Sequence, residues 1–159
     1  MAPDALEDPV TIDLPNEAAT LALGGRLAAH LQPGDVIYLS GELGAGKTTL
    51  TRGVLRGLGF EGRVKSPTYT LVELYEISRL HLYHFDFYRF ADPQEWLESG
   101  FRDLFNETNI CLVEWPEKAG ELLPPSDLTL TLKATPSNGR KAQIQAASPR
   151  GLALLSRVS

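Results

Sequence analysis

The stretch from Gly41 to Thr48 reads Gly-Glu-Leu-Gly-Ala-Gly-Lys-Thr, a full match to the phosphate-binding loop pattern G-x-x-x-x-G-K-[ST]. In such a loop the glycines let successive backbone N–H groups turn inward around phosphate oxygens. Lys47 can then reach the outer phosphates, and the Thr48 hydroxyl can bind magnesium. The sequence therefore predicts a nucleoside triphosphate site, with Leu43, Gly44, Ala45, Gly46, Lys47, Thr48 and Thr49 around the phosphates.

The sequence on both sides of this loop supports that interpretation. Val36–Leu39 is an apolar run typical of a buried strand, and residues 49–55 can continue as a helix. The N-terminal end of such a helix carries partial positive charge, which favours a bound phosphate. The alternative is a chance glycine-rich turn, which would require neither the strand before it nor the helix after it.

Two acidic residues come directly after apolar runs, where strands are expected to end. Asp86 follows the run that closes at Phe85, and Glu114 follows Ile110–Val113. Functional groups in open α/β sheets collect at strand ends. We therefore expect both carboxylates to hold magnesium, Asp86 from the outer sphere. A solvated carboxylate at a strand terminus is the alternative for each, and the presence of both beside a phosphate loop favours the metal role.

Length and composition limit the class of protein. A chain of 159 residues that is 43% hydrophobic suits a single domain, residues 1–159, with a real core. No apolar run approaches the roughly 20 residues of a membrane span, and the acidic, proline-containing residues 1–8 lack the character of a secretion signal and are expected to be flexible. Cys111 lies in an apolar run and is expected in the core. A single cysteine fits a reducing compartment, so we expect a cytoplasmic protein with no membrane contact.

Charge is unevenly distributed along the chain, and the net charge of −5 argues against wholesale wrapping of nucleic acid. Residues 47–65 carry five basic side chains against one acid, and residues 92–121 carry eight acids against two basic side chains. Two interpretations stay open. These segments form two solvated faces, or they form a phosphate-attracting side and an acidic face that docks a partner.

Alternating and helical patterns predict an α/β chain. A helix is expected to begin at an Asn16 cap and to end at Pro33–Gly34. Two strands at residues 70–75 and 80–85 must be antiparallel, because their connection is too short for a crossover. The remaining strands are expected at residues 10–14, 36–39, 110–113, 128–132 and 142–146, and the short helices at residues 93–98, 100–105 and 152–155. We predict a three-layer P-loop NTPase sandwich, a mixed sheet with an antiparallel hairpin portion.

Four segments resemble the TsaE (YjeE) family of small bacterial ATPases, namely residues 41–49, 64–70, 84–89 and 113–117. Their order and spacing agree with the family, and Phe87 replaces its usual leucine conservatively. The resemblance implies ATP as substrate with magnesium as cofactor, in the pathway that builds threonylcarbamoyladenosine beside the tRNA anticodon. It also implies the TsaD and TsaB proteins as partners, tRNA contact only through their complex, weak turnover alone, and no transferase chemistry by this chain.

The resemblance further implies roles for particular side chains. Thr68, in a Ser-Pro-Thr segment, is expected to sense the terminal phosphate and the metal, and to act with Lys47, Asp86 and Glu114 in catalysis. Its alternative is an ordinary proline turn before a strand. Glu114 is similar to the family's magnesium-associated glutamate.

Three other residues are expected beside the nucleotide because of the resemblance. Trp115 corresponds to an aromatic residue near the nucleotide, and its alternative is a partly buried anchor against Pro116. Glu17 and Arg140 correspond to contacts from the first helix and the last hairpin. For both, a plain surface charge is the alternative.

Other functions and sites compete with this prediction. A small metabolite kinase would commonly carry an arginine-rich lid, and Arg63 and Arg79 are too dispersed to form one. A guanine-nucleotide switch would need an Asn-Lys-x-Asp segment, which the sequence lacks. A zinc site is not expected, because His81 and His84 point to opposite faces of one strand. His84 is expected to pack next to Asp86.

Overall fold

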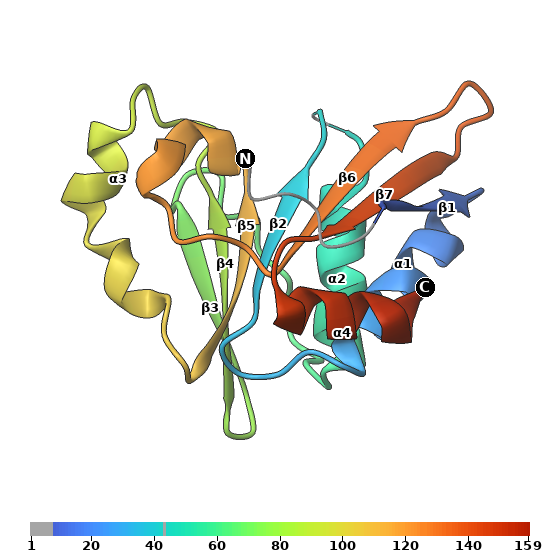
Figure 1. Cartoon of the computed structure of the whole chain (residues 1–159), viewed down its shortest axis with the longest axis horizontal. Helices are drawn as coiled ribbons and strands as arrows, with labels where there is room; N and C mark the ends of the chain where they lie inside the picture. Colours follow the sequence, from blue (N-terminus) through green and yellow to red (C-terminus); the bar gives the residue numbers. More distant parts are fainter. Residues whose placement is uncertain (1–7, 43) are drawn as a thin grey trace.

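The computed structural model describes residues 8–42 and 44–159, and a seven-stranded mixed sheet runs through them (Figure 1). The strand order is β1-β7-β6-β2-β5-β4-β3. The strands are β1 (Val10–Leu14), β2 (Val36–Ser40), β3 (Val72–Ile77), β4 (Leu80–Asp86), β5 (Asn109–Glu114), β6 (Leu128–Ala134) and β7 (Arg140–Ala146). Residues 1–7 and Leu43 lie outside the described residues, so a flexible N-terminus and a phosphate contact from Leu43 stay predictions.

The centre of the sheet is parallel and its margins are antiparallel. Strand β2 pairs in parallel with both β5 and β6, and β4 pairs in parallel with β5. The antiparallel pairs are β1–β7, β6–β7 and β3–β4. Because the parallel strands β2, β4 and β5 end at the same edge, the phosphate loop, Asp86 and Glu114 are carried to one place. The predicted mixed sheet with antiparallel hairpins is confirmed.

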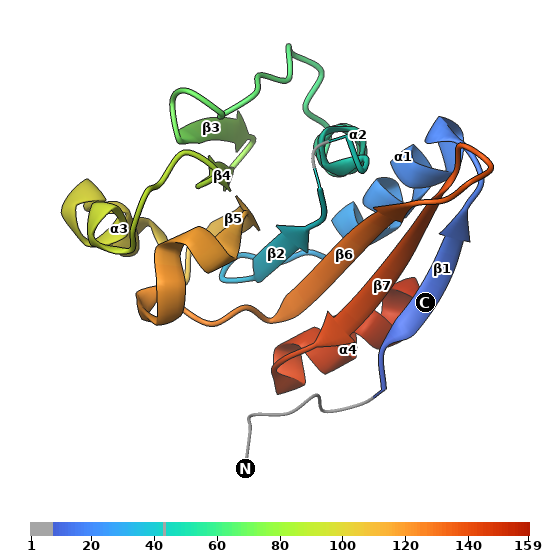
Figure 2. The ribbon, with the colours of Figure 1, turned by 90° about the horizontal axis from the view of Figure 1, so that it is seen from above.

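Helices cover both faces of the sheet (Figures 1 and 2). The helices α1 (Glu17–Ala28), α2 (Lys47–Gly57) and α4 (Pro149–Val158) share one core with the sheet, built mainly from aliphatic side chains. The opposite face carries α3 (Gln94–Ser99) and the 3₁₀ helices η1 (Phe101–Leu104) and η2 (Pro116–Leu122) over a core rich in aromatic rings. The predicted three-layer sandwich is therefore confirmed.

The helix α1 begins as the sequence indicates and ends earlier. The Asn16 side chain accepts a hydrogen bond from the Ala19 amide at 2.9 Å, which satisfies one of the unpaired N–H groups of the first turn. The helix ends at Ala28 rather than at Pro33–Gly34. The prediction was wrong here because His30 and Leu31 both donate to the Leu27 carbonyl, which tightens the chain into a turn.

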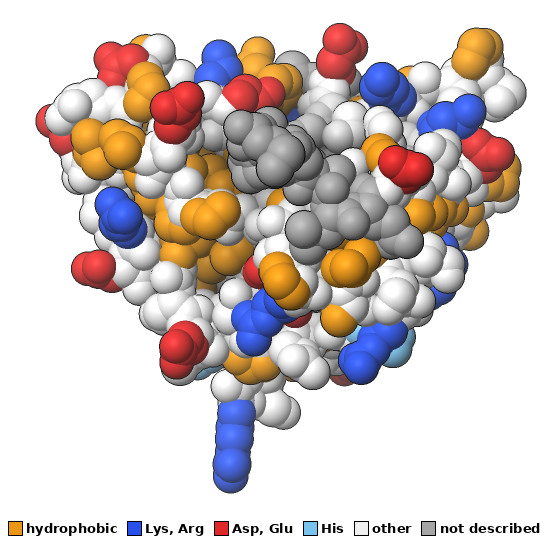
Figure 3. All heavy atoms as spheres, viewed as in Figure 1, with side chains coloured by type: hydrophobic (Ala, Val, Ile, Leu, Met, Phe, Trp, Pro, Cys, Tyr) orange, Lys and Arg blue, Asp and Glu red, His pale blue; other side chains and the backbone are white. Residues whose placement is uncertain are grey.

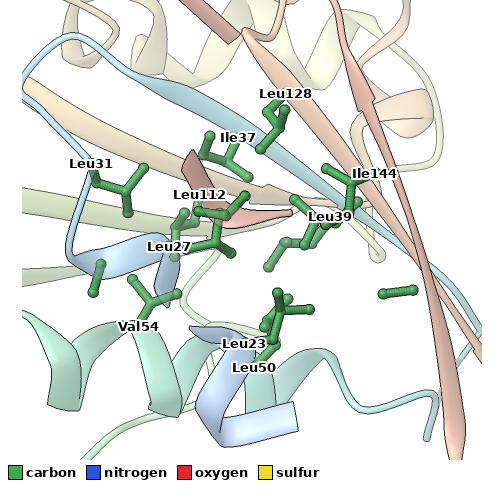
Figure 4. Packing of buried hydrophobic residues seen from close by; sticks show 14 of the residues in the cluster. Leu23, Leu27, Leu31, Ile37, Leu39, Leu50, Val54, Leu112, Leu128 and Ile144 are labelled. Atoms are coloured by element: carbon green, nitrogen blue, oxygen red, sulfur yellow. The ribbon is translucent and has the colours of Figure 1, made fainter. Parts of the chain in front are cut away.

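The helices α1 and α2 cross at contact distance between their backbones. A Cβ atom added at Gly24 would lie 2.6 Å from the Leu50 carbonyl oxygen, and one added at Gly53 would lie 2.4 Å from the Leu21 carbonyl oxygen. Apolar side chains from both helices, including Leu23 and Leu50, then point together into the sheet (Figure 4). This crossing fixes the helix that follows the phosphate loop.

Several elements differ modestly from expectation. Strand β3 begins at Val72 rather than at residue 70, because the chain is still turning at Leu71, whose φ is 70°. Helix α4 spans Pro149–Val158 rather than residues 152–155, because Ser148 caps it by accepting from the Gly151 amide at 2.9 Å. Within residues 8–42 and 44–159, every helix is too short or too polar to traverse a lipid bilayer.

The single cysteine lies in the aromatic core. Cys111 is fully buried in β5, as its apolar run predicts. Burial away from water raises the pKa of its thiol to about 12, since the thiolate would lose its hydration. The reactive form is therefore scarce at neutral pH.

Candidate functional site

The phosphate loop joins the end of β2 to the start of α2, in the strand–loop–helix arrangement that the sequence predicts. Gly46 stands directly before α2 with φ of 104°, a conformation that glycine adopts without strain. Gly41 has φ of 140°, and a Cβ atom there would lie 2.6 Å from the Leu132 carbonyl oxygen. Glycine is therefore required at these two turns of the loop.

A hollow of about 250 Å³ opens above the loop and the start of α2. It is lined by Gly44, Gly46, Lys47, Thr48, Thr49, Ser66, Thr68, Asp86, Glu114, Trp115 and Arg140. Of the predicted site residues, Ala45 and Glu17 are outside it: Ala45 lines a hollow on the β6 side of the loop, and Glu17 lines another beside α1. The structure thus gathers most of the predicted site into one cavity.

The two predicted metal-binding acids are neighbours in the sheet. Asp86 and Glu114 are register partners in the parallel pair β4–β5, so both side chains leave the same face at the same edge. Burial is the main reason that the pKa of Asp86 is raised, and the Glu114 charge raises this pKa further. The Tyr88 amide, which donates to Asp86 at 2.9 Å, and the charges of His84 and Lys47 act in the opposite direction. Two carboxylates this close favour a cation between or beside them.

The donor set around the hollow suits magnesium. Two carboxylates and the Thr48 hydroxyl are hard oxygen donors, which magnesium prefers. Among the described residues, no three His, Cys, Asp or Glu side chains come together as a metal cluster. A magnesium ion here would thus rely on water and substrate phosphate for the rest of its coordination, which is its usual mode in nucleotide sites.

Lys47 lies at the base of the hollow. Its side chain is only 5% exposed, and its Nζ donates to the Gly41 carbonyl at 2.7 Å. The same nitrogen is 3.7 Å from Oε1 of Glu114 and 4.2 Å from the centre of the Trp115 ring. The ammonium group of Lys47 therefore lies between the Glu114 carboxylate and the face of the Trp115 ring.

Trp115 adopts a backbone conformation that sequence reasoning does not reveal. Its φ is 57°, which is strained for a bulky side chain. This turn directs the ring over Lys47 and against Tyr88, with ring centres 4.9 Å apart. The ring lines the hollow and is also partly buried against the aromatic core, so both sequence interpretations of Trp115 stay open.

The Ser-Pro-Thr segment is joined to the end of β4. The Ser66 and Thr68 hydroxyls are 2.8 Å apart, and the Thr68 hydroxyl donates to Asp86 at 3.4 Å. The Leu71 amide donates to the Pro67 carbonyl, and the Leu71 carbonyl accepts from the Asp86 amide. A displacement of this segment would therefore disturb the hydrogen bonds of Asp86.

The two charges expected beside the nucleotide are Glu17 and Arg140, and only Arg140 lines the first hollow. Arg140 donates to the Gly44 carbonyl at 3.0 Å, so it contacts the loop directly. The Glu17 carboxylate is 3.7 Å from the Arg52 guanidinium, and both side chains are well exposed. Glu17 and Arg140 line a second hollow of about 200 Å³, which shares Gly46, Thr49 and Arg140 with the first.

Sequence reasoning placed His84 next to Asp86 but missed its contact with Glu114. It shares a face of β4 with Asp86, as expected, but its Nε2 atom lies 2.6 Å from Oε2 of Glu114 on the neighbouring strand. The sequence signal was present in the alternation of His84 with Asp86. Its meaning depended on the register between β4 and β5, which local patterns do not give.

Comparisons with known proteins agree with this geometry. Residues 14–142 match the family described as threonylcarbamoyl adenosine biosynthesis protein TsaE. The tRNA threonylcarbamoyladenosine biosynthesis protein TsaE of Haemophilus influenzae is 49% identical over 124 residues, 75% of this chain and 78% of that protein. Its Bacillus subtilis counterpart is 40% identical over 135 residues, covering 85% and 84%. The crystal structure of YdiB from Bacillus subtilis superposes with a TM-score of 0.83 at 32% identity, over 98% of this chain and 97% of that one.

Proposed function

The chain belongs to the TsaE family of tRNA threonylcarbamoyladenosine biosynthesis proteins, and from that premise we propose that it binds and hydrolyses ATP in support of this modification. The observation that carries the proposal is the convergence of the phosphate loop, Lys47, Asp86 and Glu114 on one hollow. The chain would use ATP and leave the transfer of the threonylcarbamoyl group to other proteins.

Each side chain of the hollow has a role in this proposal. Lys47 would contact the outer phosphates, and Thr48, Glu114 and the outer-sphere Asp86 would hold magnesium, whose charge offsets that of the phosphates. Glu114 would also orient the attacking water. Thr68 would sense the terminal phosphate through its contact with Asp86.

The loop backbone and the residues around it would bind the nucleotide. Gly44, Ala45, Gly46 and Thr49 would surround the phosphates, as would Leu43, which lies outside the described residues. Trp115 would lie against the nucleotide from the side of η2. Glu17 and Arg140 would contact the nucleotide from the second hollow.

Partner contact would come from charged faces beside the site. Most acidic side chains of residues 92–121 are exposed, on α3, η1, η2 and the segments between them, and Figure 3 shows red side chains gathered over α3 and its surroundings. Glu114 and Lys47 are buried in the hollow, so neither belongs to these charged faces. We propose that the acidic face, or the exposed part of the basic side of residues 47–65, docks the TsaD–TsaB complex. The chain would act in the cytoplasm and would reach tRNA only through that complex.

An ATPase assay tests the first part of this proposal. We expect slow release of phosphate by the chain alone and faster release with TsaD and TsaB, because a partner can complete or order the site. Lys47→Ala should abolish hydrolysis, because it removes a charge-assisted contact to the outer phosphates. Hydrolysis by the variant at the parent rate would refute the assignment of the loop. Phosphate transfer to a small acceptor would instead support the alternative, a metabolite kinase.

A reconstituted modification reaction tests the second part. Modification of tRNA by TsaD and TsaB should proceed for about one round without this chain and for many rounds with it, if ATP hydrolysis resets the complex. The Lys47→Ala variant is the matched control, since it keeps the docking faces. Sustained turnover without the chain would refute the resetting role.

A further inference from the structure

The carboxylate of Glu114 is held from two sides by different partners. Its Oε2 atom is 2.6 Å from Nε2 of His84, and its Oε1 atom is 3.7 Å from Nζ of Lys47. All three side chains are at most 7% exposed. The two oxygens are therefore not equivalent, and Oε1 is the one on the side of Lys47.

The surroundings of His84 determine which of its nitrogens makes a hydrogen bond. A carboxylate only accepts hydrogen bonds, so Nε2 must donate to it. The Nδ1 atom is buried and has no hydrogen-bond partner among the described residues. Among these residues the ring is therefore held by hydrogen bonding at Nε2. The geometry places a proton on Nε2, the atom that meets Glu114.

His84 stands behind the hollow rather than in its wall. Glu114, Asp86 and Lys47 line the cavity, and His84 does not. His84 lies above the aliphatic core on β4, where it is register partner to Leu112 of β5. It can thus influence a bound nucleotide only through residues of the lining, and its hydrogen bond is to Glu114.

We propose that His84 is a positioning residue that holds Oε2 of Glu114 and so keeps Oε1 directed to the magnesium and the attacking water. This inference rests on the proposed function. Without the donor from His84, Oε2 would be a buried carboxylate oxygen without a partner. Glu114 would then turn toward Lys47 and close the 3.7 Å gap, and it would engage the cation that must reach the phosphates.

A pair of variants of similar length separates positioning from packing. His84→Gln retains an N–H donor near the place of Nε2, and His84→Met fills similar volume with no donor. We expect both to unfold at similar denaturant concentrations. His84→Gln should keep magnesium dependence and turnover near the parent, whereas His84→Met should lose about ten-fold or more in magnesium affinity or in kcat, the usual range for outer partners of metal ligands. Equal loss in both variants would overturn the proposal.

Nitrogen-15 NMR of the histidine rings gives a readout that needs neither nucleotide nor activity. The parent should show a proton on Nε2 of His84. The Nε2 signal should move in Glu114→Gln, and much less in Asp86→Asn, which leaves the contact in place. A ring without a proton on Nε2, or equal shifts in both variants, would refute the contact. If the NMR result holds and ATP is neither bound nor hydrolysed, the proposed function fails and the contact between His84 and Glu114 stands.

Discussion

The crossing of α1 and α2 makes Gly24→Ala a demanding test of the structure, with Gly25→Ala as its matched control. A Cβ atom at Gly24 would lie 2.6, 2.7 and 2.8 Å from backbone atoms of Leu50, Val54 and Gly53. Backbone atoms cannot rotate away as a side chain can, so the helices must separate. A Cβ atom at Gly25, the next residue of the same helix, would meet nothing within 4 Å.

The two substitutions are expected to change the free energy of unfolding in opposite directions. Replacing glycine by alanine inside a helix favours the helix by about 1 kcal/mol. Gly25→Ala should gain most of that free energy of unfolding. Gly24→Ala gains the same propensity but should lose about 2–3 kcal/mol to overpacking, for a net loss of about 1–2 kcal/mol. The two variants should therefore differ by roughly 2–3 kcal/mol, although their compositions are identical.

Urea unfolding followed by circular dichroism measures both changes. In a chain of this size a change of 1 kcal/mol shifts Tm by about 2–4 °C, so thermal unfolding should separate the variants as well. Because α2 begins at Lys47, the displaced helix of Gly24→Ala should also weaken nucleotide binding. If Gly24→Ala proves as stable as Gly25→Ala, the close approach of the two helices is wrong.

Three further predictions follow from buried ionisable groups. Asp86→Asn and Glu114→Gln should each raise the magnesium concentration for half-maximal ATP hydrolysis, because each removes one negative charge from the proposed metal site, and unchanged titrations in both would exclude that site. Cys111 should react with a thiol reagent only as fast as the protein unfolds, because burial raises its pKa to about 12, and rapid labelling of the folded protein would contradict its place in the core. Burial is the largest cause of the raised pKa of Asp35 in the folded protein. The stability of the parent relative to Asp35→Asn should therefore be greatest below about pH 4, the pKa of the unfolded chain. It should fall as the pH rises through the pKa of the folded protein. Urea midpoints of both proteins across this pH range measure the difference, and a rise with pH would contradict it.

The parts of the fold that sequence analysis predicted are those set by local patterns. The cap at Asn16, the glycines of the phosphate loop and the apolar runs of β2 and β5 each act within a few residues. The acids Asp86 and Glu114 could be paired from sequence only through the general rule that parallel strands end together.

The parts that could not be predicted depend on contacts between distant segments. The partner of His84 follows from the register of β4 on β5, and a shift of one residue would turn the ring to the opposite face. The positive φ of Trp115 is imposed by its surroundings, since tryptophan has no local preference for it. The strand order likewise requires knowing that β1 pairs with β7 rather than with a nearer strand.

The pairing of β1 with β7 also has a consequence for synthesis on the ribosome. Val10 is opposite Ile144, so the first strand to leave the ribosome has its partner among the last residues made. At translation rates of about 5–20 residues per second, β1 waits on the order of ten seconds for that partner. During this time the parallel pairs of β2 with β5 and of β4 with β5 can form, because their residues have already emerged. We therefore expect the half of the sheet that carries Asp86 and Glu114 to assemble before its opposite margin closes.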